Sequence, residues 1–230
     1  MIVAIHQPNY LPWLGYFHKI TVADTFVFLD DVQFSKGSYT NRVKVLSPAG
    51  PRWITVPVRA AFGLGINEIH LAKTEWKCSH IETLRNYYRR APAFGEVWSA
   101  LPDLINDAPS SSISDLNCWL VEKISNQLGL VCDFRRSSTM DLLSKSDNRL
   151  VDIVLKVAKD GTYYSGHGAS SYQDPRKFAE AELGFTYSSF EQKAYPQFNS
   201  AVHVTGLSVL DALFNIGWDA TARMLKQATD

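Results

Sequence analysis

The sequence predicts an α/β fold, with a mainly parallel central sheet flanked by helices. Short apolar runs typical of buried strands alternate with segments of helical periodicity along the chain, which is the pattern of this fold class. The first two runs, Ile2–Ile5 and Phe26–Leu29, are separated by a segment with helical spacing of apolar residues, as in a parallel β-α-β unit. Polar residues follow both runs. Because open α/β sheets bind ligands outside the carboxyl ends of their strands, we expect the functional site there.

Length and composition favour one cytoplasmic domain. We expect a single α/β domain over residues 1–230, with a helical subregion at 76–128. The 23 basic and 23 acidic residues argue against a dominant field for nucleic acid or an anionic membrane. Three cysteines without paired spacing favour neither a disulfide framework nor a zinc site, and they indicate a reducing compartment. We find no charged leader and no apolar run of membrane-spanning length, so we expect no membrane insertion.

The elements of the first half follow from periodicity and from the positions of glycine and proline. Residues 35–44 are polar, basic and aromatic, and we expect them to form a loop. Trp53–Val58 is strand-like, with a proline that suits a sheet edge. Alternation over Ile66–Leu71 predicts another strand. Helical spacing from Trp76 predicts a helix that ends before Pro92.

The second half continues the alternation of helices and strands. Helical spacing predicts helices over Phe94–Ile105 and Ser114–Leu128, joined by a short linker at Pro109–Ser112. The elements expected after them, in order, are a strand at Leu130–Arg135, a helix at Asp147–Lys159, a strand at Thr162–Ser165, a helix at Phe178–Leu183, a strand at Phe185–Phe190 and a helix at Ser208–Lys226 that Gly217 interrupts.

The turn after the first strand carries the strongest catalytic candidate. His6 follows the strand directly, and its imidazole can act as a general base or donate a hydrogen bond to an oxyanion or phosphate. A histidine that only stabilises the turn is the alternative. Gln7 and Asn9 offer amide groups to the same space, and the rings of Tyr10 and Trp13 are expected to border a sugar or a base.

Two acidic residues end the second strand. Side chains that follow one another on a strand point to opposite faces, so the same-face pair is Asp31 and Gln33 rather than Asp30 and Asp31. One carboxylate can take a proton from an amine, orient it, or bind Mg²⁺ through water. A turn-forming aspartate is the alternative. Cys78 and His80 alone do not make a metal site.

A basic and aromatic cluster follows the second strand. Its members are Lys36, Tyr39, Asn41, Arg42 and Lys44, and Arg52 and Trp53 follow them. Arginine binds phosphate in a bidentate manner and an aromatic ring stacks on a base or a sugar face, so the cluster suits an anionic ligand that carries a ring. A UDP- or dTDP-sugar fits this description, as does the acceptor end of a tRNA. A solvated charged loop is the alternative.

Three further groups are candidates of different kinds. Ser165, Gly166 and His167 begin a glycine-rich loop after a strand, where successive backbone N–H groups can bind an anion. Ser165 is not in a GxSxG elbow, so we interpret this loop as a binding element. His80 shares a helix face that either lines the pocket or packs in the core. Asp211 and the asparagine four residues later are expected to give structural support.

Long strings in the chain resemble the WbqC-like family, which is associated with bacterial O-antigen clusters. The strings are HQPNYLPWLGYFHKI, ADTFVFLDDVQFSK, YTNRVKV, WITVPV, YYSGHGASSYQD and SVLDALFNIG. The resemblance covers nearly the whole chain. It implies a part in lipopolysaccharide O-antigen assembly, with a proposed role in attaching glycine or a related acyl group to a sugar.

A second resemblance concerns the first turn. A strand, a histidine, two residues, a polar residue and a helix are similar to the HIGH motif of nucleotidylyltransferases and class I aminoacyl-tRNA synthetases. His6 would match the first histidine and Asn9 the second, whereas Pro8 replaces the glycine that lets backbone approach a phosphate. This resemblance implies a related fold and, as the alternative activity, adenylyl or nucleotidyl transfer.

These observations lead to one expected activity. We expect a cytoplasmic transferase that attaches a glycyl or related acyl group to the amine of a nucleotide-linked amino-deoxy sugar. His6, or Asp31 as the second choice, would take the proton from the amine, with phosphates held by Lys36, Arg42 and Lys44. The acyl donor would be glycyl-tRNA, an acyl-CoA or ATP-activated glycine. A non-catalytic binding module of the same pathway is a further alternative.

Overall fold

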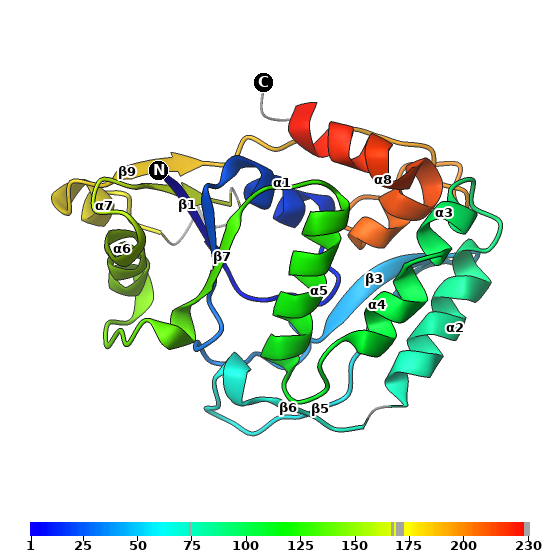
Figure 1. The fold of residues 1–230 in the computed structure, drawn as a ribbon, viewed down its shortest axis with the longest axis horizontal. Coiled ribbons are helices and arrows are strands. Elements are labelled where there is room, and N and C mark those ends of the chain that lie inside the picture. The colour runs from blue at the N-terminus through cyan, green and yellow to red at the C-terminus, as the bar shows by residue number, and fades with distance from the viewer. Residues whose placement is uncertain (74, 167, 169–172, 228–230) are drawn as a thin grey trace.

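The computed structural model describes residues 1–73, 75–166, 168 and 173–227. Five of its strands form one parallel sheet in the order β7-β2-β1-β8-β9, which is the order 3-2-1-4-5 along the chain (Figure 1). The strands are β1 (Ile2–His6), β2 (Thr25–Phe28), β7 (Asp133–Arg136), β8 (Thr162–Ser165) and β9 (Gly184–Tyr187). The prediction of an α/β fold with a mainly parallel central sheet is therefore confirmed.

The sheet separates two apolar cores because successive side chains on a strand point to opposite faces. Val3 and Ile5 of β1 pack with α6 and α7 on one face. Ala4 of β1 and Phe26 of β2 belong to the larger core on the other face. The helices of that larger core include α1 (Leu14–Val22), α5 (Ile113–Gln127) and α8 (Val209–Gln227), and those of the smaller core are α6 (Ser146–Val157) and α7 (Arg176–Glu180).

The order of the strands creates a switch point between β1 and β8. Helix α1 joins β1 to β2 and packs in the larger core, whereas α6 lies between β7 and β8 along the chain and packs in the smaller core. Figure 1 shows the two helices on opposite sides of the sheet. A crevice opens at the carboxyl ends of the strands wherever the connections diverge in this way.

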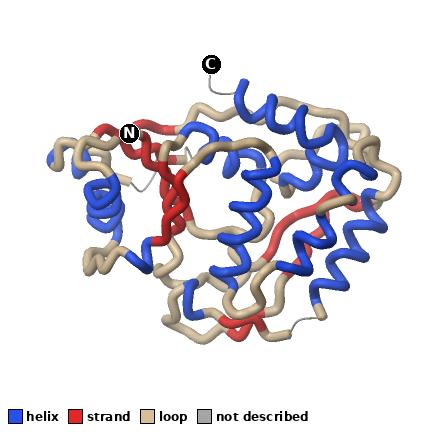
Figure 2. The backbone as a smooth tube through the Cα atoms, in the orientation of Figure 1, coloured by secondary structure: helices blue, strands red, loops and turns tan. Residues whose placement is uncertain are grey.

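The remaining elements lie on the side of the larger core. An antiparallel hairpin, separate from the parallel sheet, is formed by β3 (Arg42–Ser47) and β4 (Gly50–Thr55), and Figure 2 shows it as a second group of strands. Beside it lie the short pair β5 (Val58–Arg59) and β6 (His70–Leu71), and the helices α2 (Trp76–Tyr88), α3 (Phe94–Trp98) and α4 (Leu101–Asp107). Among the described residues, no helix has the length and apolar character needed to cross a bilayer.

Three sequence predictions for these elements are wrong. The end of the expected loop at residues 35–44 belongs to β3, because Val43 and Val45 are buried and pair with β4. Ile66–Leu71 is a 3-10 turn followed by two strand residues, because the Glu68 carboxylate accepts a hydrogen bond from Gly65 N at 2.7 Å and stabilises the turn. Phe94–Ile105 is not one helix, since α3 and α4 are separate.

Candidate functional site

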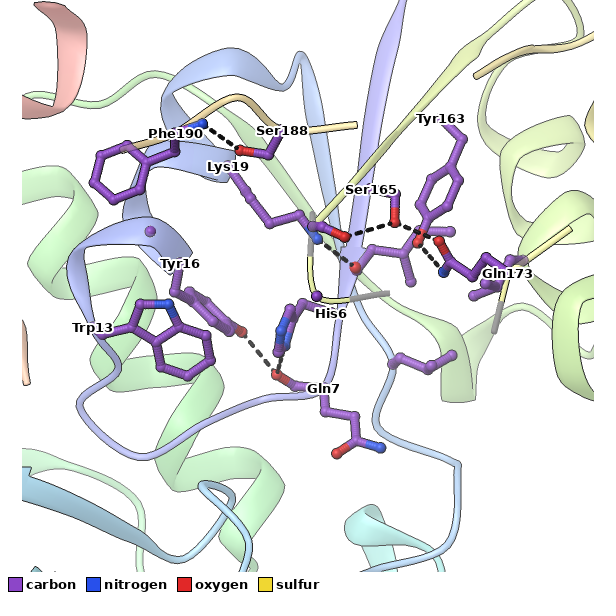
Figure 3. Close-up of a pocket in the computed structure, with 16 residues that line it drawn as sticks. His6, Gln7, Trp13, Tyr16, Lys19, Tyr163, Ser165, Gln173, Ser188 and Phe190 are labelled. Atoms are coloured by element: carbon purple, nitrogen blue, oxygen red, sulfur yellow. Dashed lines mark hydrogen bonds between the residues drawn. The ribbon is translucent and has the colours of Figure 1, made fainter. Parts of the chain in front are cut away.

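A cavity of about 640 Å³ lies at the switch point. Its wall contains residues from the carboxyl ends of β1 and β8, from the loop after β9 and from helix α1 (Figure 3). The residues from these segments are Ile5, His6, Gln7, Trp13, Gly15, Tyr16, Lys19, Tyr163, Ser165, Gly166, Gly168, Ser188 and Phe190. The cavity therefore lies where the fold class predicts a ligand site.

The hydrogen bonds of His6 define which ring nitrogen carries the proton. Nδ1 of His6 lies 3.0 Å from the Gln7 carbonyl oxygen, which also accepts a hydrogen bond from the Tyr16 hydroxyl at 3.0 Å. A carbonyl oxygen cannot donate, so Nδ1 is the protonated nitrogen and Nε2 keeps its lone pair. No described residue forms a hydrogen bond with Nε2. The rings of Tyr16 and Trp13 lie edge-on to the imidazole, at centroid distances of 4.8 and 5.8 Å.

The surroundings keep this imidazole neutral. The pKa of His6 is lowered to about 3. Burial is the main cause and the positive charge of Lys19 adds to it, whereas the hydrogen bond to Gln7 opposes both effects. His6 is therefore an acceptor at physiological pH, and its basicity depends on the charge of Lys19 beside it.

Lys19 is the functional candidate that the sequence prediction missed. It is 4% exposed and lines the cavity, and its ammonium group donates a hydrogen bond to the Ile5 carbonyl oxygen at 3.1 Å. No carboxylate of the described residues forms a salt bridge with it. Burial alone lowers its pKa to about 7. The available signal was a single lysine among the buried apolar residues of the short helix that follows the His6 turn.

Ser165 at the end of β8, and Gly166, Gly168 and Gln173 beyond it, line another part of the cavity. The Ser165 hydroxyl is buried and donates to Gln173 Oε1 at 2.5 Å, and Gln173 Nε2 donates to the Tyr163 hydroxyl at 3.0 Å. A Cβ atom at Gly166 would lie 3.9 Å from the Lys19 Nζ, so the glycine keeps a side chain out of contact with the ammonium group. His167, which was predicted to bind substrate, lies outside the described residues.

A row of aromatic rings connects the cavity wall with the basic hairpin. Trp13 lies 5.1 Å from Tyr39 between ring centroids, and Tyr39 lies 5.4 Å from Trp53. The Arg42 guanidinium lies 4.3 Å from the Trp53 ring centroid and the Lys44 ammonium 5.1 Å from it, as cation–π contacts. Of these residues, only Trp13 also lines the cavity. The hairpin cations thus lie beyond the cavity wall, at the far end of this ring row.

Several residues predicted to bind substrate have other positions in the structure. Asn9, Tyr10, Asn41 and His80 are buried and do not line the cavity. The Tyr10 hydroxyl bonds His80 Nδ1 at 2.9 Å, and Asn41 Nδ2 donates to the backbone at 3.1 Å. Asn41 Oδ1 is buried without a partner among the described residues. Because all four side chains are buried outside the cavity wall, the structure places them in the core rather than at the candidate site. Two others, Gln33 and Lys36, are exposed outside the cavity wall.

Asp31 is paired with a cation from a distant part of the chain. Its carboxylate accepts hydrogen bonds from the Arg149 guanidinium and from the Ser137 hydroxyl, the latter at 2.6 Å. Asp30 is buried and accepts from the hydroxyls of Ser114 and Ser138. Neither carboxylate lines the cavity. His6 is therefore the better-placed proton acceptor of the two residues that the sequence suggested.

The described residues contain no group of three His, Cys, Asp or Glu side chains arranged as metal ligands. The groups suited to a ligand are instead the Lys19 ammonium, the His6 imidazole and the Trp13 and Tyr16 rings inside the cavity. Together they can bind a polar molecule with a ring and an anionic group, and accept one proton from it.

Comparison with known proteins agrees with the resemblance of the sequence strings. The model of the WbqC-like protein family matches residues 7–223. The chain is 33% identical over 221 residues to the uncharacterized protein Rv1507c of Mycobacterium tuberculosis (strain ATCC 25618 / H37Rv), with 95% of each chain covered. No solved structure matches the chain. The residues that match the family model include the His6 turn from Gln7 onwards, helix α1, the hairpin and the loop after β8, and the chain belongs to the WbqC-like protein family.

Proposed function

We propose that this protein is a transferase of O-antigen assembly that attaches a glycyl or related acyl group to the amine of a nucleotide-linked amino-deoxy sugar. The observation that carries the proposal is the cavity at the switch point, in which His6 keeps Nε2 unprotonated beside the buried cation Lys19. Family membership supports the link to O-antigen assembly through the resemblance of the sequence.

The proposed reaction needs one proton acceptor and one site for negative charge. The amine nitrogen of the sugar attacks the acyl carbonyl carbon, so a C–N bond forms and the bond from that carbon to its leaving group breaks. Nε2 of His6 takes the proton from the amine and returns it to the leaving group. The Lys19 ammonium lies close enough to His6 to lower its pKa, and it would stabilise negative charge that develops on the carbonyl oxygen or the leaving group.

The rings around His6 support the binding of a sugar. Trp13 and Tyr16 line the cavity next to the imidazole, and aromatic faces pack well against sugar rings. Outside the wall, the ring row through Tyr39 and Trp53 ends at Arg42. A nucleotide attached to the sugar would extend along this row, with its phosphates near the hairpin cations and its base on an exposed ring.

A second candidate activity is adenylyl or nucleotidyl transfer. The strand order 3-2-1-4-5 and a cavity at its switch point are features of mononucleotide-binding α/β sheets. The first turn also resembles the HIGH motif at His6 and Asn9. In this case the protein would activate glycine or a related acid with ATP or CTP and release pyrophosphate.

The test is a direct assay of the purified protein. A panel of UDP- and dTDP-linked amino sugars is incubated with glycyl-tRNA, with glycyl-CoA or with glycine plus ATP, and the sugars are analysed by mass spectrometry. We expect an acylated sugar with one of the donors. Pyrophosphate release without an acylated sugar would support nucleotidyl transfer instead, and the absence of both products across the panel would overturn the acyl-transfer proposal.

A further inference from the structure

The most informative feature beyond the proposed reaction is the charge of Lys19. An ammonium group has three N–H donors, and Lys19 uses one of them, for the Ile5 carbonyl oxygen at 3.1 Å. The free energy cost of burying a cation is large unless an opposite charge or several acceptors compensate it. Within the described part of the chain, neither kind of compensation is present around Lys19.

The neighbours of Lys19 cannot neutralise it. His6 is neutral, and its Nδ1 proton points to the Gln7 carbonyl oxygen. The Ser165 hydroxyl donates to Gln173, and the Ser188 hydroxyl accepts from Phe190 N at 3.2 Å. These two hydroxyls are uncharged. Asp30, which follows the cavity-lining Leu29, accepts hydrogen bonds from Ser114 and Ser138, and Asp31 is paired with Arg149; neither carboxylate lines the cavity. An anionic group of a bound molecule would supply the compensation that the described residues do not.

The glycine loop makes room for that charge. Gly166 lies near Lys19, and the one atom of the described residues that a Cβ atom at this position would meet is the Lys19 Nζ, at 3.9 Å. No positive φ is imposed at Gly166, so backbone strain does not explain the glycine. A side chain here would contact the ammonium group. The absence of one gives a small group access to Lys19.

We propose that Lys19 and Gly166 form an anion-binding position at the base of the cavity, which takes one oxyanion group of the substrate, a phosphate or a carboxylate. The inference rests on the proposed function only in taking this cavity as the substrate site. Binding of the anion also has a consequence for catalysis. It cancels the field of Lys19 at Nε2 of His6, so the imidazole becomes a stronger base when substrate is present.

The experiment titrates the protein with simple anions in the absence of any donor or sugar. Lysine labelled with ¹³C at Cε is followed by NMR while inorganic phosphate, and separately acetate, is added. We expect the Lys19 resonance to move with one of the two anions. Preference for phosphate would indicate a phosphate group as the natural occupant, and preference for acetate would indicate a carboxylate. No shift with either anion would overturn the proposal.

Two variants and one control locate the site. Lys19→Met removes the charge at similar volume, and we expect the affinity for the preferred anion, measured by calorimetry, to fall at least tenfold. Gly166→Ala keeps the charge and covers it, and we expect a smaller loss of affinity. Lys77→Met is the matched control, because Lys77 also donates to backbone carbonyls, of Asn106 and Ala108, but does not line the cavity. Unchanged affinity in both cavity variants would overturn the proposal.

The outcomes separate this inference from the proposed function. Anion binding that depends on Lys19, together with no acylated sugar in the transfer assay, would leave the anion site established and remove the acyl-transfer proposal. If the wild type is an active transferase but its Lys19→Met variant binds the anions as tightly as the wild type, the acyl-transfer proposal stands and the anion site is overturned. If Lys19→Met fails to fold, Gly166→Ala and the NMR titration of the wild type still decide the question.

Discussion

Two buried ionisable side chains, Lys19 at the cavity and Asp211 in helix α8, have opposite surroundings. Neither forms a salt bridge with a described residue. Asp211 is 0% exposed, and its carboxylate accepts hydrogen bonds of 2.9 Å from Tyr88, Tyr195 and Gln197. Lys19 donates to one carbonyl oxygen. The carboxylate is saturated by the protein itself, whereas the ammonium is not.

This difference separates a structural charge from a functional one. Burial raises the pKa of Asp211, with its three donors opposing that effect, and burial lowers the pKa of Lys19 to about 7. The donors to Asp211 come from α2 and from the segment before α8, and Tyr88 also accepts from Leu46 N of the hairpin. Asp211 therefore holds several elements together. Lys19 joins only α1 to β1, through the Ile5 carbonyl oxygen, and no described residue accepts from its other donors, which border the cavity.

The largest expected effect is a loss of stability when the structural residue Asp211 is replaced. Asp211→Ala leaves the Tyr88, Tyr195 and Gln197 donors buried without their acceptor, and we expect the free energy of unfolding to fall by about 4 kcal/mol. Urea denaturation measures it. Asp219→Ala, at an exposed position of the same helix, is the control and should change stability by less than ~0.5 kcal/mol. Equal losses of unfolding free energy in both variants would show that the hydrogen bonds of Asp211 do not stabilise the fold more than an exposed aspartate does.

The second effect is a loss of activity when the cavity residue His6 is replaced. His6→Gln keeps a polar side chain but removes the basic Nε2, and we expect kcat of the transfer reaction to fall about a hundredfold or more. His70→Gln is the matched control, since the exposed His70 also has Nδ1 near a carbonyl oxygen, that of Ser111 at 3.1 Å. Its kcat should equal that of the wild type. A fully active His6→Gln enzyme would show that His6 only stabilises the turn.

The third effect has the opposite sign, because replacing Lys19 should stabilise the protein without ligand. Its pKa is about 7 in the folded chain and 10.5 ordinarily, so between these pH values the unfolded chain holds a proton that the folded chain has released. The contribution of Lys19 to stability is full above 10.5 and is lost as the pH falls toward 7. The corresponding slope is at most ~1.4 kcal/mol per pH unit.

Lys19→Met removes this pH dependence. We expect the variant to be more stable than the wild type by about 2 kcal/mol at pH 7, and the gain should shrink as the pH rises toward 9. Urea denaturation at several pH values, compared between the two proteins, isolates the contribution of this one group. A variant that is destabilised at every pH would mean that Lys19 is structural, as Asp211 is.

The smallest effect is expected outside the cavity. Trp53 is 40% exposed under the Arg42 and Lys44 cations, and Trp53→Ala should raise KM for the nucleotide sugar about fivefold, a loss of ~1 kcal/mol, with kcat unchanged. Phe62→Ala, at a fully exposed ring, is the control. If KM is the same in both variants, the ring row does not contribute to binding of the nucleotide sugar, and the binding site is limited to the cavity.

Local sequence patterns were sufficient to predict the strands that border the site and several residues that line it. The apolar runs placed β1 and β8, and the polar residues directly after them, His6, Gln7, Ser165 and Gly166, do line one cavity. The interruption at Gly217 is also confirmed, since its φ of 78° and ψ of 175° fall where glycine is almost the only residue found. Such features depend on neighbours in the chain, and sequence periodicity reports them.

Partners far apart in the chain were beyond the reach of these patterns. The carboxylate of Asp31 and the guanidinium of Arg149 are 118 residues apart in sequence, and the bond between Tyr10 and His80 spans 70 residues. No periodicity indicates which distant side chain will satisfy a polar group. The expectations for Asp31 and for the buried Tyr10 and His80 therefore differ from their positions in the structure.

The sequence by itself determined that polar turns follow buried parallel strands, because a continuous apolar run marks a strand that is buried on both faces of the sheet. Only the tertiary structure decided which of the charges near those turns would be compensated. Compensation depends on donors and acceptors that come from separate elements. Three such donors reach the Asp211 carboxylate, whereas one acceptor reaches the Lys19 ammonium. Whether a buried charge supports the fold or waits for a ligand is thus a property of its three-dimensional surroundings.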